Sequence, residues 1–442
     1  MPPFSPATQA WFDAAFTAAT PAQSGAWDAI ARGEHTLVVA PTGSGKTLAA
    51  FLSSLDRLAA LPVPEDSLRR CRVLYVSPLK ALAVDIERNL RSPLAGIRQA
   101  AARLGLAEPD VTVAMRTGDT SPDERRLFAR RPADILITTP ESLFLLLTSG
   151  AREALRGVDT VIVDEVHAVC ATKRGAHLAV SLERLDALLE QPAQRIGLSA
   201  TVRPVDEVAT FLAGGRPVTV VQPPAQKTFD LQVVVPVEDM STLGEPTGDL
   251  SGAASGAERR TSIWPHVEER VLDLIEQHRS TIVFANSRRL AERLTARLNE
   301  LESERQGVAL VPSTKPPAQV MAESGAGRPA GDVVVARAHH GSVSREQRRI
   351  VEEELKAGRL PSVVATSSLE LGIDMGAVDL VVQVEAPPSV ASGLQRVGRA
   401  GHQVGAISRG VILEPPAFVT NGVNALLEGI TRRSATATGA AQ

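Results

Sequence analysis

Short apolar segments alternate with stretches of helical period along most of this chain, and this alternation limits the possible folds. In the first half the apolar segments are residues 37–40, 72–76, 111–113, 135–137, 161–163 and 196–198. Candidate helices such as 81–90 and 176–189 lie between them. Strands without a polar face, separated by helices, are typical of a parallel sheet covered on both sides. Because further apolar segments follow at 281–284, 333–335, 363–365 and 380–383, we predict two α/β units in tandem.

Composition suggests where the units begin and end. Residues 236–261 are rich in Gly, Ser, Glu, Pro and Ala, which favours a linker, and residues 312–331 have a similar composition. We expect a first lobe over residues 1–222 and a second lobe over 223–415. We also expect flexible segments near 240–261 and 312–331, and a tail over 416–442.

Overall composition excludes several classes of protein. With 44% hydrophobic and 22% charged residues among 442, the chain has enough apolar material for two globular cores. No apolar run approaches the roughly 18 residues of a membrane span, so we expect no membrane association. Two cysteines, Cys71 and Cys170, are too few for a disulfide framework or a cysteine-rich zinc site. These features favour a cytoplasmic protein, and a net charge of −3 does not by itself indicate a polyanionic partner.

The segment Ala40-Pro-Thr-Gly-Ser-Gly-Lys-Thr47 follows an apolar strand and leads into the apolar helix 48–58. Glycines in such a loop let backbone N–H groups surround phosphates. Lys46 would reach the terminal phosphates and Thr47 would hold Mg²⁺. The usual first glycine is Ala40 here. The candidate nucleotide contacts in the loop are Thr42, Gly43, Ser44, Gly45, Lys46 and Thr47.

Two carboxylates, Asp164 and Glu165, end the apolar strand 161–163. Together with a phosphate loop, they predict catalysis of phosphoryl transfer, which depends on positioning and charge neutralisation. Asp164 would hold Mg²⁺ through water, and Glu165 would polarise the attacking water. Taken alone, two carboxylates at a strand end could be a solvated terminus.

Two further segments are ambiguous by themselves. Ser199-Ala-Thr201 follows a strand and could be a simple helix cap. Arg396 and Arg399 are three residues apart around a glycine. Such a pair can present two guanidinium groups to one phosphate. The alternative interpretation is that the segment is a solvated surface helix.

In their order, these motifs resemble those of superfamily-2 helicases, and more narrowly the Lhr-type (large helicase-related) DNA helicases. The resemblance covers approximately residues 11–409. It also rests on Pro21-Ala-Gln23 and on the segments 77–82, 117–119, 138–142, 284–288, 339–342, 365–374 and 395–402. The fold that it implies is a pair of tandem RecA-like P-loop NTPase domains.

The resemblance implies a role for each matching residue. Gln23 would read adenine, and Gly372 and Asp374 would contact the nucleotide from the second lobe. Arg396 and Arg399 would act as arginine fingers, and Ser199 and Thr201 would couple hydrolysis to movement. Residues expected to hold the nucleic-acid backbone are Lys80, Thr117, Thr139 and Thr366. Gln23 could instead cap a helix, and the two threonines of the first lobe could instead close turns.

The function implied is an ATP-dependent helicase that uses ATP and Mg²⁺ to move along single-stranded DNA or a tailed duplex. By resemblance the direction is 3′ to 5′ and the process is DNA repair. An RNA-remodelling helicase and a nucleic-acid-binding remnant are the alternatives. Lhr-type proteins continue past the last motif, whereas this sequence ends at Gln442. The comparison therefore predicts a truncated copy after the second lobe.

Overall fold

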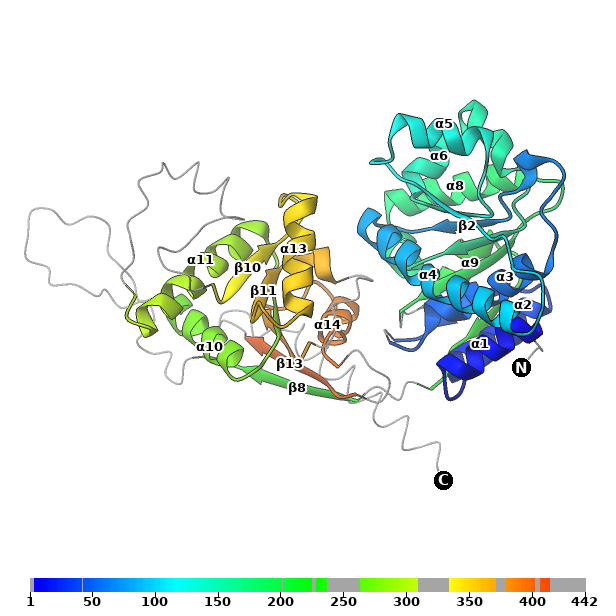
Figure 1. Ribbon diagram of the computed structural model, residues 1–442. Coiled ribbons are helices and arrows are strands. Elements are labelled where there is room, and N and C mark those ends of the chain that lie inside the picture. The colour runs from blue at the N-terminus through cyan, green and yellow to red at the C-terminus, as the bar shows by residue number, and fades with distance from the viewer. Residues whose placement is uncertain are drawn as a thin grey trace, which may run out of the picture. The chain divides into compact units, whose positions relative to one another are not determined.

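The chain divides into two compact units, residues 1–225 and 226–442. The computed structural model describes residues 4–41, 43–200, 202, 204–224, 228–236, 263–308, 334–370, 378–401 and 406–413. Over these residues each unit contains one parallel sheet, of seven strands in the first unit and six in the second (Figure 1). The predicted class, two parallel α/β domains, is confirmed.

The sheet of the first unit has the strand order β3-β4-β2-β5-β6-β1-β7. Its strands are β1 (His35–Val39), β2 (Val73–Val76), β3 (Val113–Arg116), β4 (Ile135–Thr138), β5 (Thr160–Val163), β6 (Gln194–Ser199) and β7 (Val218–Val221). Its helices are α1 (Pro6–Ala15), α2 (Pro21–Ala31), α3 (Lys46–Ala60), α4 (Lys80–Arg103), α5 (Pro122–Arg130), α6 (Pro140–Leu147), α7 (Val166–Val169), α8 (Lys173–Leu188) and α9 (Val205–Ala213). Short 3₁₀ turns are η1 (Ser67–Arg69) and η2 (Gly150–Leu155).

Successive residues of β2 pack in two different hydrophobic cores, one on each face of the sheet. Val73 and Tyr75 pack in the core that also contains apolar residues of α1 to α4. Leu74 and Val76 pack in the core that contains residues of α6 and α8. Figure 1 shows α3 and α4 on one face of this sheet and α6 and α8 on the other. Because successive side chains of a strand point to opposite faces, a sheet covered on both sides needs apolar residues at every position.

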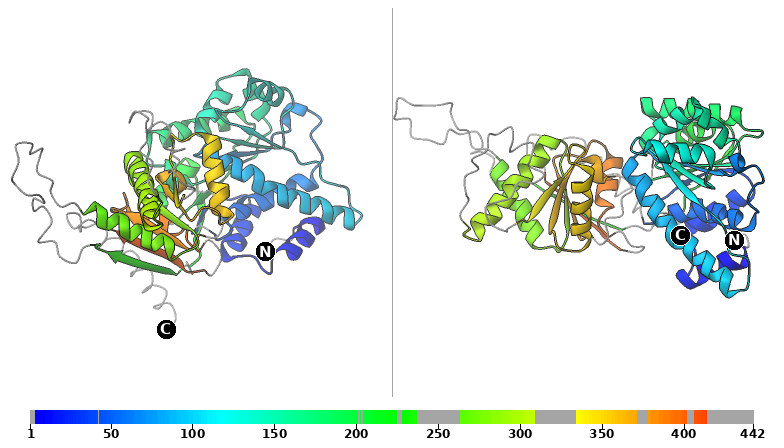
Figure 2. Two further views of the ribbon diagram at one scale, coloured as in Figure 1. Left: turned by 60° about the vertical axis from the view of Figure 1, so that its left-hand side comes forward. Right: turned by 45° about the horizontal axis from the view of Figure 1, so that its top comes forward.

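The sheet of the second unit has the strand order β10-β11-β9-β12-β13-β8. Its strands are β8 (Phe229–Val234), β9 (Thr281–Phe284), β10 (Ala336–His339), β11 (Ser362–Ala365), β12 (Leu380–Val384) and β13 (Ser408–Leu413). Its helices are α10 (Trp264–Glu276), α11 (Arg288–Arg305), α13 (Arg345–Lys356) and α14 (Val390–Val397), with the 3₁₀ turn η3 (Ser367–Leu369). In the views of Figure 2, α10 and α11 cover one face of this sheet, and α13 and α14 cover the other.

Some elements differ from those expected from the sequence. The strand predicted at 111–113 is β3 over Val113–Arg116, because the Thr112 N–H donates to the Asp134 carboxylate at 2.9 Å. The strand predicted at 333–335 is β10 over Ala336–His339. The sequence patterns did not indicate β7, β8 and β13. The first two are edge strands of their sheets, and most of their residues are only half-buried or exposed.

In the part of the chain that the structure describes, none of the helices combines the length and the apolar character needed to cross a membrane.

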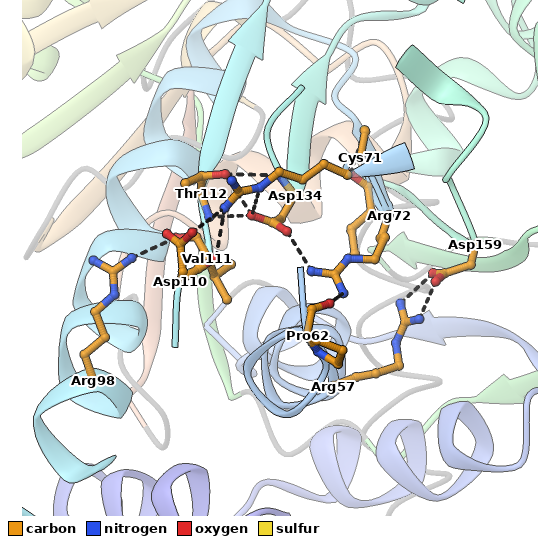
Figure 3. Close-up of polar contacts among 12 residues, drawn as sticks. Arg57, Pro62, Cys71, Arg72, Arg98, Asp110, Val111, Thr112, Asp134 and Asp159 are labelled. Carbon is orange, nitrogen blue, oxygen red and sulfur yellow. Dashed lines mark hydrogen bonds and ion pairs between the residues drawn. The ribbon is translucent and has the colours of Figure 1, made fainter. Parts of the chain in front are cut away.

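A buried charge network closes the amino edge of the first sheet (Figure 3). Asp134, just before β4, is fully buried. One of its oxygens accepts from Arg72 at 2.7 Å, and the other accepts from Arg70 at 3.0 Å and from the Thr112 hydroxyl at 2.8 Å. Burial opposes ionisation of Asp134, but the hydrogen bonds from Arg72, Thr112 and Arg70 outweigh it and lower the pKa of Asp134. The carboxylate therefore joins the residues that precede β2, β3 and β4.

This network predicts a large stability loss for Asp134→Ala. The substitution leaves the buried Arg72 guanidinium without its carboxylate, which should cost about 3–5 kcal/mol of unfolding free energy. Because its pKa is lowered by folding, the contribution of Asp134 is complete above about pH 5, one unit above the unfolded-state pKa, and is lost as the pH falls through the folded-state pKa. Urea unfolding measures the loss, followed by tryptophan fluorescence with Trp264 of the second unit replaced by phenylalanine so that only Trp11 and Trp27 report.

The matched control is Asp123→Ala, which removes an exposed carboxylate that pairs with Arg126 on α5. Exposed ion pairs contribute little, so this variant should unfold close to the unsubstituted chain. Equal unfolding midpoints for the two variants would show that the network does not hold the sheet edge.

Candidate active site

The phosphate loop joins β1 to α3 at the carboxyl edge of the first sheet. Gly43 and Gly45 have positive φ angles of 81° and 78°, which side chains rarely adopt. Gly45 is the N-cap of α3, and no side chain caps this helix end. The first N–H groups of a helix have no acceptor within the helix, so this uncapped end has the form of a phosphate-binding helix terminus.

Two residues at the start of α2 hold the loop in place. The Thr20 hydroxyl donates to the Ser44 carbonyl at 2.9 Å, and the Gln23 amide donates to the Gly45 carbonyl at 3.4 Å. Gln23 also accepts from the Thr20 N–H at 2.9 Å, in a capping box that starts α2. The side chain of Gln23 thus caps a helix and contacts the phosphate loop in the same conformation.

Parallel pairing brings the other candidate residues to this loop. β6 lies between β1 and β5, with Val39 opposite Ser199 and Val163 opposite Gly197. Lys46, at the start of α3, donates from Nζ to the Ser199 carbonyl at 3.2 Å. The lysine, the two carboxylates after β5 and the end of β6 therefore gather at one edge of the sheet.

Asp164 is buried, and both of its oxygens accept hydrogen bonds. Oδ1 accepts from the Glu165 N–H at 2.9 Å, and Oδ2 accepts from the hydroxyl of Tyr75. Burial and the neighbouring Glu165 charge raise the pKa of Asp164 to about 7, although Tyr75 and Lys46 act in the opposite direction. Burial, and then the charge of Asp164, raise the pKa of Tyr75, so its hydroxyl remains a proton donor.

Glu165 has a left-handed backbone, with φ 44° and ψ 46°. Such a conformation is unfavourable for a residue other than glycine, and strained residues of this kind cluster at functional sites. The carboxylate is buried, and its Oε2 accepts no hydrogen bond. This oxygen lies 3.6 Å from Nδ1 of His167. A buried carboxylate oxygen without a donor is available to a water molecule or to another polar group.

His167 links the carboxylates to the end of β6. Its Nδ1 accepts from the Ala200 N–H at 3.2 Å and lies 3.2 Å from the Ser199 hydroxyl. Our site prediction included Ser199 but neither His167 nor Tyr75. His167 could have been selected, because it lies only two residues after Glu165 in the sequence. Tyr75 could not, because its approach to Asp164 depends on the register of β2 against β5.

Three candidate nucleic-acid contacts follow the neighbouring strands β2, β3 and β4 at the same edge. Lys80 pairs with Asp119 at 2.6 Å, and both side chains are about half exposed. The Thr117 hydroxyl accepts from the Asp119 N–H at 3.3 Å, and the Thr139 hydroxyl accepts from the Ser142 N–H at 3.4 Å. Both threonines are buried and make the local turn and cap bonds that were the alternative interpretation.

In the second unit the two candidate arginine fingers lie next to Glu370. Arg396 donates to the Glu370 carboxylate at 3.0 Å and to Gln383 at 2.8 Å, and it stacks over Phe284. Arg399 donates to the Glu370 carbonyl at 2.8 Å. Both arginines are 2% exposed. Thr366 follows β11, and its N–H donates to the His339 carbonyl at 3.3 Å.

Four predicted site residues, Thr42, Thr201, Gly372 and Asp374, lie outside the described residues.

Comparisons with known proteins match both units. The model for the DEAD/DEAH box helicase family matches residues 20–208, and the model for the helicase conserved C-terminal domain matches residues 266–403. The chain is 64% identical to the Lhr helicase/probable uracil glycosylase of Mycolicibacterium smegmatis over 92% of its length. Over this length the chain is similar to the Lhr helicases. The predicted resemblance is confirmed.

A second helicase and a solved structure show the same similarity. The Lhr-Core ATP-dependent helicase of Methanocaldococcus jannaschii is 38% identical over 91% of this chain. A solved structure of Mycobacterium smegmatis helicase Lhr bound to single-stranded DNA and AMP-PNP superimposes with a TM-score of 0.82, at 60% identity over 97% of this chain. This chain spans 26% of the first relative, 42% of the second and 50% of the chain in the solved structure.

The loop geometry predicts that Gly45→Ala disrupts the site. A Cβ at this position would lie 2.4 Å from Nε2 of Gln23, so the side chain that contacts the loop must move. We expect nucleotide affinity to fall by about tenfold or more, because the N–H groups of the loop lose their arrangement. Equilibrium binding of a fluorescent ATP analogue measures the change.

Gly33→Ala is the matched control. Gly33 has nearly the same φ angle, 76°, but a Cβ there meets nothing within 4 Å. Both variants carry the strain of a left-handed alanine, about 1–2 kcal/mol, and only one displaces Gln23. If both variants bind nucleotide equally well, the contact between Gln23 and the loop does not matter for binding.

Proposed function

We propose that this chain is the motor core of an ATP-dependent DNA helicase, which hydrolyses ATP to move along single-stranded DNA in the 3′ to 5′ direction. In this proposal residues 1–222 form the ATP-binding lobe and residues 223–415 form the second lobe. The observation that carries the proposal is the gathering of Lys46, Asp164 and Glu165 after β1 and β5, two parallel strands that both pair with β6. The single-stranded DNA and AMP-PNP bound by the M. smegmatis Lhr structure support the choice of ligands.

The residues at this edge fit a magnesium–nucleotide complex. The N-terminus of α3 would offer N–H groups to phosphates, the Thr47 hydroxyl would supply an oxygen ligand to Mg²⁺, and the Asp164 carboxylate would hold the ion through water. Mg²⁺ in such sites takes one or two protein oxygens, substrate phosphates and water. When bound, the ion neutralises phosphate charge during transfer. The described residues contain no cluster of three or more His, Cys, Asp or Glu side chains for a metal, which agrees with an ion shared with a nucleotide.

Each site residue then has a chemical task. Lys46 holds the terminal phosphates, and Gln23 reads the adenine edge. Glu165, with an oxygen that accepts no hydrogen bond, orients and deprotonates the attacking water. Ser199, together with Thr201, couples hydrolysis to movement through His167, which lies beside Glu165.

The second lobe completes the site in this mechanism. Gly372 and Asp374 contact the nucleotide, and Arg396 and Arg399 act as arginine fingers. In this structure both arginines donate hydrogen bonds to Glu370. To reach a phosphate, each arginine must give up its bond to Glu370. Lys80, Thr117, Thr139 and Thr366 hold the nucleic-acid backbone, a mode that does not require base recognition.

Two substitutions test the ATP site. Lys46→Ala should remove both nucleotide binding and turnover. Glu165→Gln keeps the shape of the side chain but not the base, so it should bind ATP and lose turnover by about a hundredfold or more. ATPase assays with and without single-stranded DNA, and with RNA of equal length, measure turnover and distinguish a DNA motor from an RNA remodeller. Normal turnover by either variant would contradict the site assignment.

The ion pair between Lys80 and Asp119 generates a second test. A nucleic-acid phosphate must replace Asp119 at Lys80, so Asp119→Asn should tighten single-stranded DNA binding severalfold. Lys80→Ala should weaken binding and lower the slope of log K against log salt by about 0.7, the value for one phosphate contact on a single strand. Fluorescence anisotropy at several salt concentrations measures both effects.

Asp123→Asn is the control for the effect of net charge. It removes the same charge from the same region, but Asp123 pairs with Arg126 and not with Lys80. Equal tightening by the two asparagine variants would assign the effect to overall charge and not to Lys80.

A further inference from the structure

Tyr75 is the single tyrosine of the chain, and the assignments above leave it without a role. Its side chain is completely buried in β2, and its hydroxyl donates to Oδ2 of Asp164. A phenylalanine would fill the same space without a polar atom. Since a buried hydroxyl costs free energy unless it is hydrogen-bonded, the hydroxyl at this position is explained by its bond to Asp164.

The ring of Tyr75 is held between the phosphate-loop helix and the strand that carries the carboxylates. It stacks on Phe51 of α3, with the ring centroids 5.0 Å apart and the planes inclined by 24°. β2 pairs directly with β5, with Tyr75 opposite Ile162, and the Asp164 N–H donates to the Val76 carbonyl at 2.9 Å. Both the ring and the backbone around it are therefore fixed with respect to Asp164.

The two donors to Asp164 determine the orientation of its carboxylate. Oδ1 accepts from the Glu165 N–H at 2.9 Å, and Oδ2 accepts from Tyr75. Two donors on different oxygens prevent rotation about the bond between Cβ and the carboxyl carbon. Hydrogen bonds of this kind to a metal-binding side chain commonly change metal affinity or activity by 10–100-fold.

We propose that Tyr75 is a positioning residue for the magnesium–nucleotide site, acting by holding the Asp164 carboxylate in its binding orientation. This inference rests on the function proposed above. Tyr75 does not touch the nucleotide in this scheme. It links α3, which begins at Lys46, with Asp164, so that the phosphate-binding and metal-binding groups keep a fixed relation.

The substitution Tyr75→Phe tests the proposal, because it removes the hydroxyl and keeps the ring. Binding of a fluorescent ATP analogue is measured as Mg²⁺ is added, with no requirement for turnover. We expect the Mg²⁺ concentration at half-saturation to rise by about tenfold, and the affinity without Mg²⁺ to stay within twofold of that of the unsubstituted chain. A half-saturation within twofold of the unsubstituted value would overturn the proposal.

Phe51→Leu is the matched control for packing. It changes the ring stack beneath Tyr75 and keeps the hydroxyl, so its Mg²⁺ half-saturation should remain close to that of the unsubstituted chain. An equal rise in Phe51→Leu and Tyr75→Phe would assign the effect to packing and overturn the positioning role. Failure of the unsubstituted chain to bind the nucleotide at all would instead contradict the proposed function.

The single tyrosine also allows a spectroscopic test. Incorporation of 3-fluorotyrosine labels only position 75, and ¹⁹F NMR reports on its surroundings. Addition of Mg²⁺ at saturating nucleotide should move the resonance, because the partner of the hydroxyl gains a cation nearby. A resonance that Mg²⁺ leaves unchanged would show that Tyr75 does not sense the metal site, and would overturn the proposal.

Discussion

The position of β6 between β1 and β5 is the constraint on which the candidate site depends. All three strands are parallel, so their carboxyl ends lie at one edge, and the residues that follow them meet there. The contact between Lys46 and the Ser199 carbonyl, over 153 residues of sequence, is a direct consequence. So is the approach of His167 to Ser199. A different strand order would leave the same motifs in the chain and separate them in space.

Buried carboxylates have different hydrogen-bonding surroundings at the two edges of the first sheet. At the amino edge Asp134 is surrounded by donors from Arg72, Arg70 and Thr112, and its pKa is lowered. At the carboxyl edge Asp164 has a raised pKa, and the nearby Glu165 has an oxygen without a donor. A buried carboxylate with donors on both oxygens, such as Asp134, holds the structure together, whereas a buried carboxylate oxygen without a donor, such as Oε2 of Glu165, is ready to bind another group. This contrast distinguishes the structural edge from the functional one.

Several candidate residues make local bonds as well as offering groups to a ligand. Gln23 completes the capping box of α2 and contacts the phosphate loop. Thr139 caps α6, and Thr117 bonds within its turn. A cap and a binding role are compatible, because a hydroxyl oxygen has two lone pairs and one proton. The capping interpretation and the ligand interpretation of these residues are therefore not exclusive.

The sequence by itself determined the α/β class, the phosphate loop and the pair Asp164–Glu165, because apolar periodicity and short motifs are properties of neighbouring residues. It did not indicate the edge strands β7 and β8, whose half-buried residues lack a continuous apolar run. Only the tertiary structure decided that Tyr75 donates to Asp164, and that Arg396 and Arg399 lie against Glu370. These contacts join residues 26 to 89 positions apart. Their physical basis is strand register and packing, which no local pattern specifies.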